Sequence, residues 1–335
     1  MRKPRFVALL LVTILCLTSL PGRADDKKDD VDDIGNRKVA HRSIISQEKE
    51  IAIGKQYADE IDKQAKILKD PVINEYVNRV AQNLAKNSDL NIPLTIKVID
   101  DPAINAFTLP GGFMYLNTGT IMAADEEDQI AGVIAHEIGH AAARHWASTM
   151  TKATIMQFAM LPLMFIPMSY AVYMGVMEAY MNGVPLAFLK FSRKDEAEAD
   201  FLGLQYMYKA GYDPNAFVGF FGKVMDEERR SPGSMAKVFA DHPPTGDRII
   251  ASEEEIQKIL PKRPEYLVST SEFDDIKARL QSVITQHKRQ KGDSGPTLRK
   301  RETPDSSSTQ SGQQKTDTTG DDQPPVLKRR DGPSN

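Results

Sequence analysis

Cysteine is almost absent from this chain of 335 residues, which contains only Cys16. That residue lies in an apolar run, residues 6–20, which follows three basic residues and precedes a short small-residue stretch. The pattern is typical of a secretory signal peptide, and we expect residues 1–24 to be removed on export. The remaining chain would have no cysteine, which excludes disulfides and thiolate ligands. A zinc site would therefore need histidine and carboxylate.

An excess of basic residues is absent as well. The formal net charge is −3, and it moves to −7 without the signal, which carries four basic residues and no acidic ones. This charge pattern gives no indication of a nucleic-acid partner. The sequence also shows no internal repeat, so we expect no helical-repeat module for binding partners.

Both ends of the remaining chain are poor in large apolar residues. Residues 25–43 are highly charged and predict a leader that does not pack on the fold. Residues 287–335 predict a disordered tail. The folded domain is therefore expected between residues 44 and 286.

The domain is predicted to be mainly helical with a small sheet. Apolar residues recur at helical spacing in residues 46–68 and 71–87. Two strand-like runs follow in residues 104–119, separated by Pro-Gly-Gly as in a hairpin. A long helical pattern then covers about 126–146, and a later one ends at Gly211. This order of helices, small sheet and helices indicates an α+β fold.

The sequence HEIGH at residues 136–140 carries the HExxH pattern. His136 and His140 are four residues apart, so on a helix they point to the same side and can bind one ion. Glu137 lies next to the first of them, where a carboxylate can take the proton of a zinc-activated water. The alternative is a set of polar residues on an ordinary helix. Their apolar and small neighbours favour a metal, because buried polar groups need partners.

A third histidine, His145, follows this motif. On a continuous helix it would be rotated by about 140° from His140 and could not share the ion. The metzincin continuation HxxGxxH is absent too, because Ala143 and Trp146 occupy the positions of its glycine and last histidine. We therefore interpret His145 as a surface or packing histidine.

A carboxylate has to supply the third ligand, and the acidic stretch SRKDEAEAD at residues 192–200 offers several. Glu196 and Asp200 share one face of a helix, so one can bind the ion while the other accepts the N–H of a ligand histidine. Glu198 is about 200° away from Glu196 and is expected to face solvent. The alternative is an acidic helix start that the helix dipole favours.

The two motifs together resemble those of the HtpX-like zinc metallopeptidases, gluzincins that include the CAAX prenyl proteases and the soluble periplasmic BepA type. The second element of that family is SRxxExxAD, which this chain matches at Ser192, Arg193, Glu196, Ala199 and Asp200. The resemblance runs from about residue 44 to 285 and includes INAFTLPGG and HPPTGDR. It implies a zincin-type domain with one Zn²⁺ per chain, Glu196 as the third ligand and Asp200 as its supporting partner.

Further site residues follow around this cleft. In the family, the strand around Asn105, Ala106 and Phe107 lies near the cleft, where an extended substrate could pair with an exposed edge. His242 opens HPPTGDR, and it could stabilise an oxyanion or occupy the ion's open position, with loop packing as the alternative. Arg248 is expected to pair with a carboxylate that holds this loop, with a substrate role as the alternative.

Residues 153–190 form an apolar, Met-rich segment with no charged residue between 153 and 177. A single membrane crossing would put the two histidines and Glu196 on opposite sides of the membrane. Two crossings need about 40 apolar residues plus a turn, and this segment is too short for that. We therefore expect a helical flap beside the cleft that rests on a membrane surface or on unfolded polypeptide. Plain core packing is the alternative.

The sequence thus predicts an exported, periplasmic zinc endopeptidase, peripherally membrane-associated if the apolar segment touches lipid. The resemblance implies protein quality control, with misfolded or misassembled envelope proteins as the polypeptide substrates. One alternative is an envelope chaperone or assembly factor whose zinc site is structural or latent. A non-proteolytic zinc hydrolase is the other.

Overall fold

The computed structural model describes residues 29–160, 169–178, 191–230, 242 and 245–292. Two compact units divide the chain at residue 290, and the second contributes only residues 291 and 292 to the described part. The described helices are α2 (Gln47–Gln64), α3 (Pro71–Lys86), α4 (Thr118–Ala123), α5 (Glu127–Ala143), α6 (His145–Met160), α7 (Tyr170–Glu178), α9 (Arg193–Ala210), α10 (Asn215–Arg230), α11 (Gly246–Ile259) and α12 (Ser271–Gly292). The strands are β1 (Thr95–Ile99), β2 (Ala106–Leu109) and β3 (Phe113–Asn117).

The three strands form one sheet in the order β1-β3-β2. β1 is parallel to β3, and β2 joins β3 as an antiparallel hairpin through Pro110, Gly111 and Gly112. Both glycines have positive φ angles, 78° and 84°, which side chains with a Cβ rarely adopt. β2 is an edge strand and pairs with no second strand among the described residues. The predicted α+β class, mainly helical with a small sheet, is confirmed.

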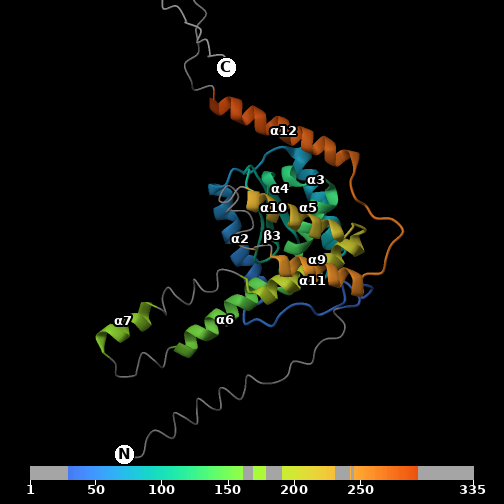
Figure 1. Cartoon of the computed structure of the whole chain (residues 1–335). Coiled ribbons are helices and arrows are strands. Elements are labelled where there is room, and N and C mark those ends of the chain that lie inside the picture. Colours follow the sequence, from blue (N-terminus) through green and yellow to red (C-terminus); the bar gives the residue numbers. More distant parts are fainter. Residues whose placement is uncertain (1–28, 161–168, 179–190, 231–241, 243–244, 293–335) are drawn as a thin grey trace, which may run out of the picture. The chain divides into compact units, whose positions relative to one another are not determined.

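Helix α5 lies at the centre of the described part of the first unit (Figure 1). It packs against α3, α9, α10 and β2, and all its residues except Gln129 and Ala141 are buried. The closest neighbour is α9, and small residues make that approach possible. A Cβ on Gly139 would lie 2.8 Å from the Ala199 carbonyl oxygen, and one on Gly203 would lie 3.0 Å from the His136 nitrogen.

The ends of α9 follow the local sequence. Ser192 caps its first turn, because the Ser192 hydroxyl accepts from the Asp195 N–H while the Asp195 carboxylate accepts from the Ser192 N–H. At the other end Gly211 adopts a left-handed φ of 96°, as expected for a glycine that terminates a helix. The predicted end of this helix at Gly211 is confirmed.

The expected continuous helix over residues 126–146 is wrong. Helix α5 ends at Ala143, Arg144 has a left-handed φ of 56°, and α6 begins at His145. The Arg144 side chain holds this break, since its guanidinium lies 2.7 Å from a Glu50 carboxylate oxygen and donates to the Ile45 carbonyl. The break thus coincides with a long-range ion pair, which helical periodicity cannot reveal.

The expectation that residues 25–43 do not pack is wrong for the described part of that range, residues 29–43. Val31 and Val39 are buried, and the Arg37 guanidinium lies 2.6 Å from the buried Asp89 carboxylate. Farther along, the backbone N–H of His41 donates to the Ala143 carbonyl at the end of α5. High charge did not prevent packing here, because the buried charge has a buried partner.

The other predicted boundaries fall partly outside the described residues. Helix α12 continues to Gly292, past the predicted end of the domain at 286, and His287 on it lies 3.0 Å from an Asp100 carboxylate oxygen. The predicted signal peptide, residues 1–24, and the tail from 293 onward lie outside the described residues. Their assignments stay predictions.

The apolar segment, residues 153–190, is described only in part. It contributes the end of α6 and all of α7, which expose the large apolar side chains Ile155, Met156, Phe158, Tyr170, Val172, Tyr173 and Met174. Core packing therefore does not account for these described residues. Among the helices that the structure describes, none has the length and hydropathy needed to span a bilayer.

We predict that Gly139→Ala destabilises the protein, because the added methyl group would press on the backbone of α9. Overpacking of this kind costs about 1–3 kcal/mol. The matched control is Gly219→Ala on α10, where a Cβ meets nothing within 4 Å, so the free energy of unfolding should stay unchanged or rise by up to about 1 kcal/mol. Urea denaturation of both variants measures the difference. Equal stabilities would contradict the close approach.

A second prediction concerns the N-terminal segment. Arg37→Ala leaves the Asp89 carboxylate buried without its charged partner, which should lower the free energy of unfolding by about 3–5 kcal/mol. Lys55→Ala is the control, because Lys55 and Asp59 form an exposed ion pair worth less than about 0.5 kcal/mol. Thermal and urea denaturation report both values. A loss below about 1 kcal/mol for Arg37→Ala would show that residues before 44 contribute little to the fold.

Candidate metal centre

Helix α5 brings His136, Glu137 and His140 into the interior. All three are buried, and the Nε2 atoms of His136 and His140 lie 3.1 Å apart. The i and i+4 spacing puts both rings on the face that α9 covers. The close contact of α5 and α9 therefore decides what these histidines meet.

Helix α9 places Glu196 opposite the two rings. One Glu196 carboxylate oxygen lies 3.6 Å from His136 Nε2, and the other lies 3.6 Å from His140 Nε2. His242 completes the group, with its Nδ1 atom 2.8 Å from Glu196 Oε1. Ligand atoms of these four buried residues all lie within 4.8 Å of one another.

These residues fit a zinc ion. Zn–N and Zn–O bonds of about 2.0–2.2 Å in a tetrahedron place ligand atoms roughly 3.3–3.6 Å apart. The two histidine Nε2 atoms lie 3.1 Å apart, and each lies 3.6 Å from one of the two Glu196 oxygens, which is close to this spacing. Glu196 Oε2 is buried without a hydrogen bond, although the Arg248 guanidinium lies 3.1 Å away at a poor angle. Both Glu137 carboxylate oxygens are also buried without a hydrogen bond of regular geometry, although the Thr108 hydroxyl lies near enough to lower the pKa of Glu137 somewhat. Buried oxygens of this kind are expected where a cation and a water belong.

Asp200 on α9 and Arg248 on α11 contact the four residues of the centre. Asp200 Oδ1 lies 2.9 Å from His136 Nδ1, a contact close in distance but outside regular hydrogen-bond angles. Arg248 donates from Nε and Nη2 to the two Asp200 oxygens, at 2.7 and 2.6 Å, and from Nη1 to the His242 carbonyl at 3.3 Å. The guanidinium thus ties the loop that carries His242 to the helix that carries Glu196.

Burial and neighbouring charges shift the pKa values of several groups of the centre. Burial raises the pKa of Glu137, and it lowers the pKa of His140 well below its usual range, helped by the neighbouring His136. Burial would also raise the pKa values of Glu196 and Asp200, but both are lowered. A hydrogen bond from His242 outweighs burial at Glu196, and hydrogen bonds from Arg248 outweigh it at Asp200. For His242, burial opposes protonation, yet the Glu137 and Glu196 carboxylates raise the pKa to about 9.

The predicted substrate strand is only partly beside this centre. Ala106 is buried, and the Phe107 ring stacks on Tyr115 at 5.2 Å, within a cluster that contacts α2. The Asn105 carbonyl accepts the Asn117 N–H, which ties that residue to the sheet. The structure therefore does not bring Phe107 to the metal centre. Thr108, the next residue, has the opposite orientation, as strand alternation requires.

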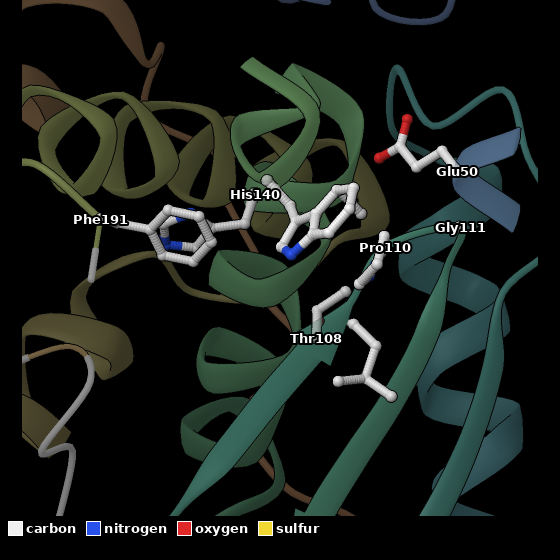
Figure 2. Close-up of a pocket in the computed structure, with 9 residues that line it drawn as sticks. Glu50, Thr108, Pro110, Gly111, His140 and Phe191 are labelled. Atoms are coloured by element: carbon white, nitrogen blue, oxygen red, sulfur yellow. The ribbon is translucent and has the colours of Figure 1, made fainter. Parts of the chain in front are cut away.

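Thr108 lines a hollow beside His140 (Figure 2). Figure 2 also shows Phe191 against the His140 ring, with a stacking distance of 4.3 Å between centroids. The enclosed part of this hollow measures only about 10 Å³, roughly the room for one water molecule, so it is a shallow recess and not a pocket for a whole small molecule. The other lining residues are Glu50, Leu109, Pro110, Gly111, Ala141 and Trp146.

Two residues lie elsewhere than expected. His145, interpreted as a surface or packing histidine, is completely buried, and its Nδ1 atom lies 2.8 Å from His140 Nδ1. Glu198, expected to face solvent, has a side chain only 19% exposed and contacts His145 and His41. The burial of His145 agrees with the packing alternative, but its contact with His140 contradicts the expected rotation away from that ring, which assumed a continuous helix. The expectation that Glu198 faces solvent is wrong, because the segment around His41 covers it. No sequence signal marks the break at Arg144.

The chain is similar to known proteins over the same residues. The model of "Peptidase family M48" matches residues 71–256. The putative beta-barrel assembly-enhancing protease of Vibrio cholerae is 32% identical over 260 residues, covering 74% of this chain and 53% of the relative. The beta-barrel assembly-enhancing protease of Escherichia coli is 27% identical over 283 residues, covering 83% and 56%. The mitochondrial metalloendopeptidase OMA1 of Arabidopsis thaliana is 37% identical over 165 residues, covering 48% and 32%.

The chain spans about half the length of the first two of these relatives. The matched region nevertheless contains both metal-binding motifs, His242 and Arg248. Since the family model covers more than half of the sequence and all residues of the metal centre, the chain belongs to peptidase family M48.

Proposed function

We propose that this protein is a zinc-dependent endopeptidase. The observation that carries the proposal is the Glu137 carboxylate, which is buried without a hydrogen bond of regular geometry next to a cluster of three histidines and a glutamate. A buried carboxylate of this kind is suited to take a proton from a water molecule beside the metal. The names of the relatives, protease and metalloendopeptidase, support the same reaction class.

Each residue has a defined task in this proposal. His136, His140 and Glu196 would hold the metal through Nε2, Nε2 and the carboxylate. A zinc ion, when bound, supplies Lewis-acid chemistry that makes water more acidic and polarises a carbonyl. Glu137 accepts the water proton and passes it to the leaving amine. His242 lies at the same place, with its Nε2 atom 3.7 Å from Glu137 Oε1. It would either donate a hydrogen bond to the substrate carbonyl oxygen as negative charge develops there, or bind the metal as a fourth ligand.

The substrate is proposed to be an extended polypeptide. The edge of β2 pairs with no second strand in the described part of the chain and can accept an extended strand through backbone hydrogen bonds, next to the recess lined by Thr108 and Trp146. The names of the bacterial relatives support misassembled envelope proteins as substrates. The N-terminal signal pattern supports export, and together they favour the periplasm.

The exposed apolar residues of α6 and α7 favour a second candidate function. Phe158 and Tyr170 are 65% and 78% exposed, and a surface of this kind is typical of sites that hold unfolded polypeptide or rest on a membrane. The protein could then act as an envelope chaperone, with a structural or latent zinc site. Peripheral membrane contact through residues 153–190 belongs to the same proposal.

The Glu137→Gln variant separates these functions. The amide cannot accept the water proton, so cleavage of an unfolded protein such as reduced casein should fall by about 10²–10⁴-fold while zinc content stays unchanged. Glu60→Gln on the exposed face of α2 serves as the control and should keep full activity. A host phenotype that survives Glu137→Gln with zinc bound would favour the chaperone. Turnover of small esters without cleavage of casein would favour a non-proteolytic hydrolase.

Metal analysis tests the ligand set. Purified protein should contain about one zinc per chain, and Glu196→Ala should lose most of it, because two histidines alone hold zinc weakly. Glu253→Ala, an exposed position on α11, is the matched control and should retain full occupancy. Full occupancy with unchanged activity in Glu196→Ala would contradict the role of Glu196.

A further inference from the structure

A second group of histidines and a carboxylate lies directly behind His140. His41, His145 and Glu198 offer ligand atoms that all lie within 4.8 Å of one another. His41 Nε2 lies 2.6 Å from Glu198 Oε2, and His145 Nε2 lies 3.3 Å from the same oxygen. His145 also touches the metal centre, because its Nδ1 atom lies 2.8 Å from His140 Nδ1.

The break at Arg144 creates this contact. On a continuous helix His145 would point away from His140, but the left-handed residue between them turns the chain so that the two rings meet. The ring centroids lie 4.9 Å apart at an angle of 74°. A non-glycine residue rarely adopts this conformation, so the surrounding contacts have to hold Arg144 in it.

The positions of the protons follow from the metal ligation. If His140 binds zinc through Nε2, the atom that faces His136 and Glu196, its proton must sit on Nδ1. That N–H can only donate to His145 Nδ1, which places the proton of a neutral His145 on Nε2. The Nε2–H in turn donates to Glu198, whose carboxylate also accepts from His41 Nε2. Every contact then has one donor and one acceptor.

We propose that His145 and Glu198 are positioning residues that fix the ring orientation and tautomer of His140 as a zinc ligand, with His41 holding Glu198 in place. The proposal rests on the zinc site proposed above. His136 has a carboxylate, Asp200, next to its Nδ1 atom, whereas His140 reaches its carboxylate through a second imidazole. Such partners of metal ligands raise metal affinity because they remove the freedom of the ligand ring.

The same three residues could instead bind a cation themselves, and the proton positions argue against it. A metal on His145 Nε2 would move the His145 proton to Nδ1, which would then donate to His140 Nδ1. The His140 proton would be forced onto Nε2, the atom that faces the proposed zinc site. With neutral histidines, the two metal sites therefore exclude each other.

Zinc affinity of His145→Phe tests the relay. The phenyl ring keeps the packing of this buried position but accepts no hydrogen bond, so zinc should bind about 10–100-fold more weakly in competition with a chelator. His145→Gln offers a carbonyl acceptor and should restore part of the loss. His287→Phe, the same exchange on α12, is the matched control and should bind zinc as the parent does.

Ring ¹⁵N NMR of the zinc-loaded parent protein gives an independent readout. His140 should show the Nδ1–H tautomer and His145 the Nε2–H tautomer, and Glu198→Ala should disturb the His145 signals and weaken zinc binding. This measurement remains informative even if His145→Phe fails to fold.

Three results would overturn the relay. They are unchanged zinc affinity in a folded His145→Phe, an Nδ1–H tautomer at His145 in the zinc-loaded parent, and a second zinc per chain that requires His41. Absence of zinc from the parent protein would instead contradict the proposed function itself, so the two failures can be told apart.

Discussion

The close approach of α5 and α9 is the constraint on which the rest of the structure depends. Each helix presents a glycine to the backbone of the other, Gly139 against Ala199 and Gly203 against His136. With side chains at these points, the helix axes would move apart and Glu196 would withdraw from the two histidine rings. A metal centre with bonds of about 2 Å tolerates little of this movement. The glycine of HEIGH is thus as much a part of the centre as its histidines.

Such close packing buries charges, and the structure balances them in pairs. Glu196 and Asp200 share the Arg248 guanidinium, which lies across both carboxylates. The same arrangement recurs away from the centre, where Arg37 meets Asp89 and Arg144 meets Glu50. In each pair the partners are far apart in sequence, so each one joins two segments. The polar groups therefore determine how the segments are arranged, while apolar burial supplies most of the stability.

Local sequence patterns predicted the parts of this protein that depend on local physics. Helical periodicity, the Pro-Gly-Gly turn and the glycine at position 211 were sufficient to identify the α+β class, the hairpin and the end of α9. HExxH indicated that His136 and His140 lie together, because i and i+4 spacing puts two residues on one face of any helix. Spacing left both Glu196 and Asp200 as candidates for the third ligand, and the resemblance to a known family favoured Glu196, which the structure places beside the two histidines. His145, Glu198 and the segment before residue 44 could not be predicted in the same way. Their surroundings depend on the turn at Arg144 and on ion pairs between distant segments, which leave no periodic pattern.

The segment around His41 connects distant parts of the chain. His41 reaches Glu198, 157 positions away, and Arg37 reaches Gln205, 168 positions away. Contacts of such high sequence separation are slow to form, because the long intervening chain must first be ordered. During synthesis, the segment around His41 is made early and can form these contacts only after α9 has been made. Folding of the region around His140 is therefore completed only after most of the domain has been synthesised.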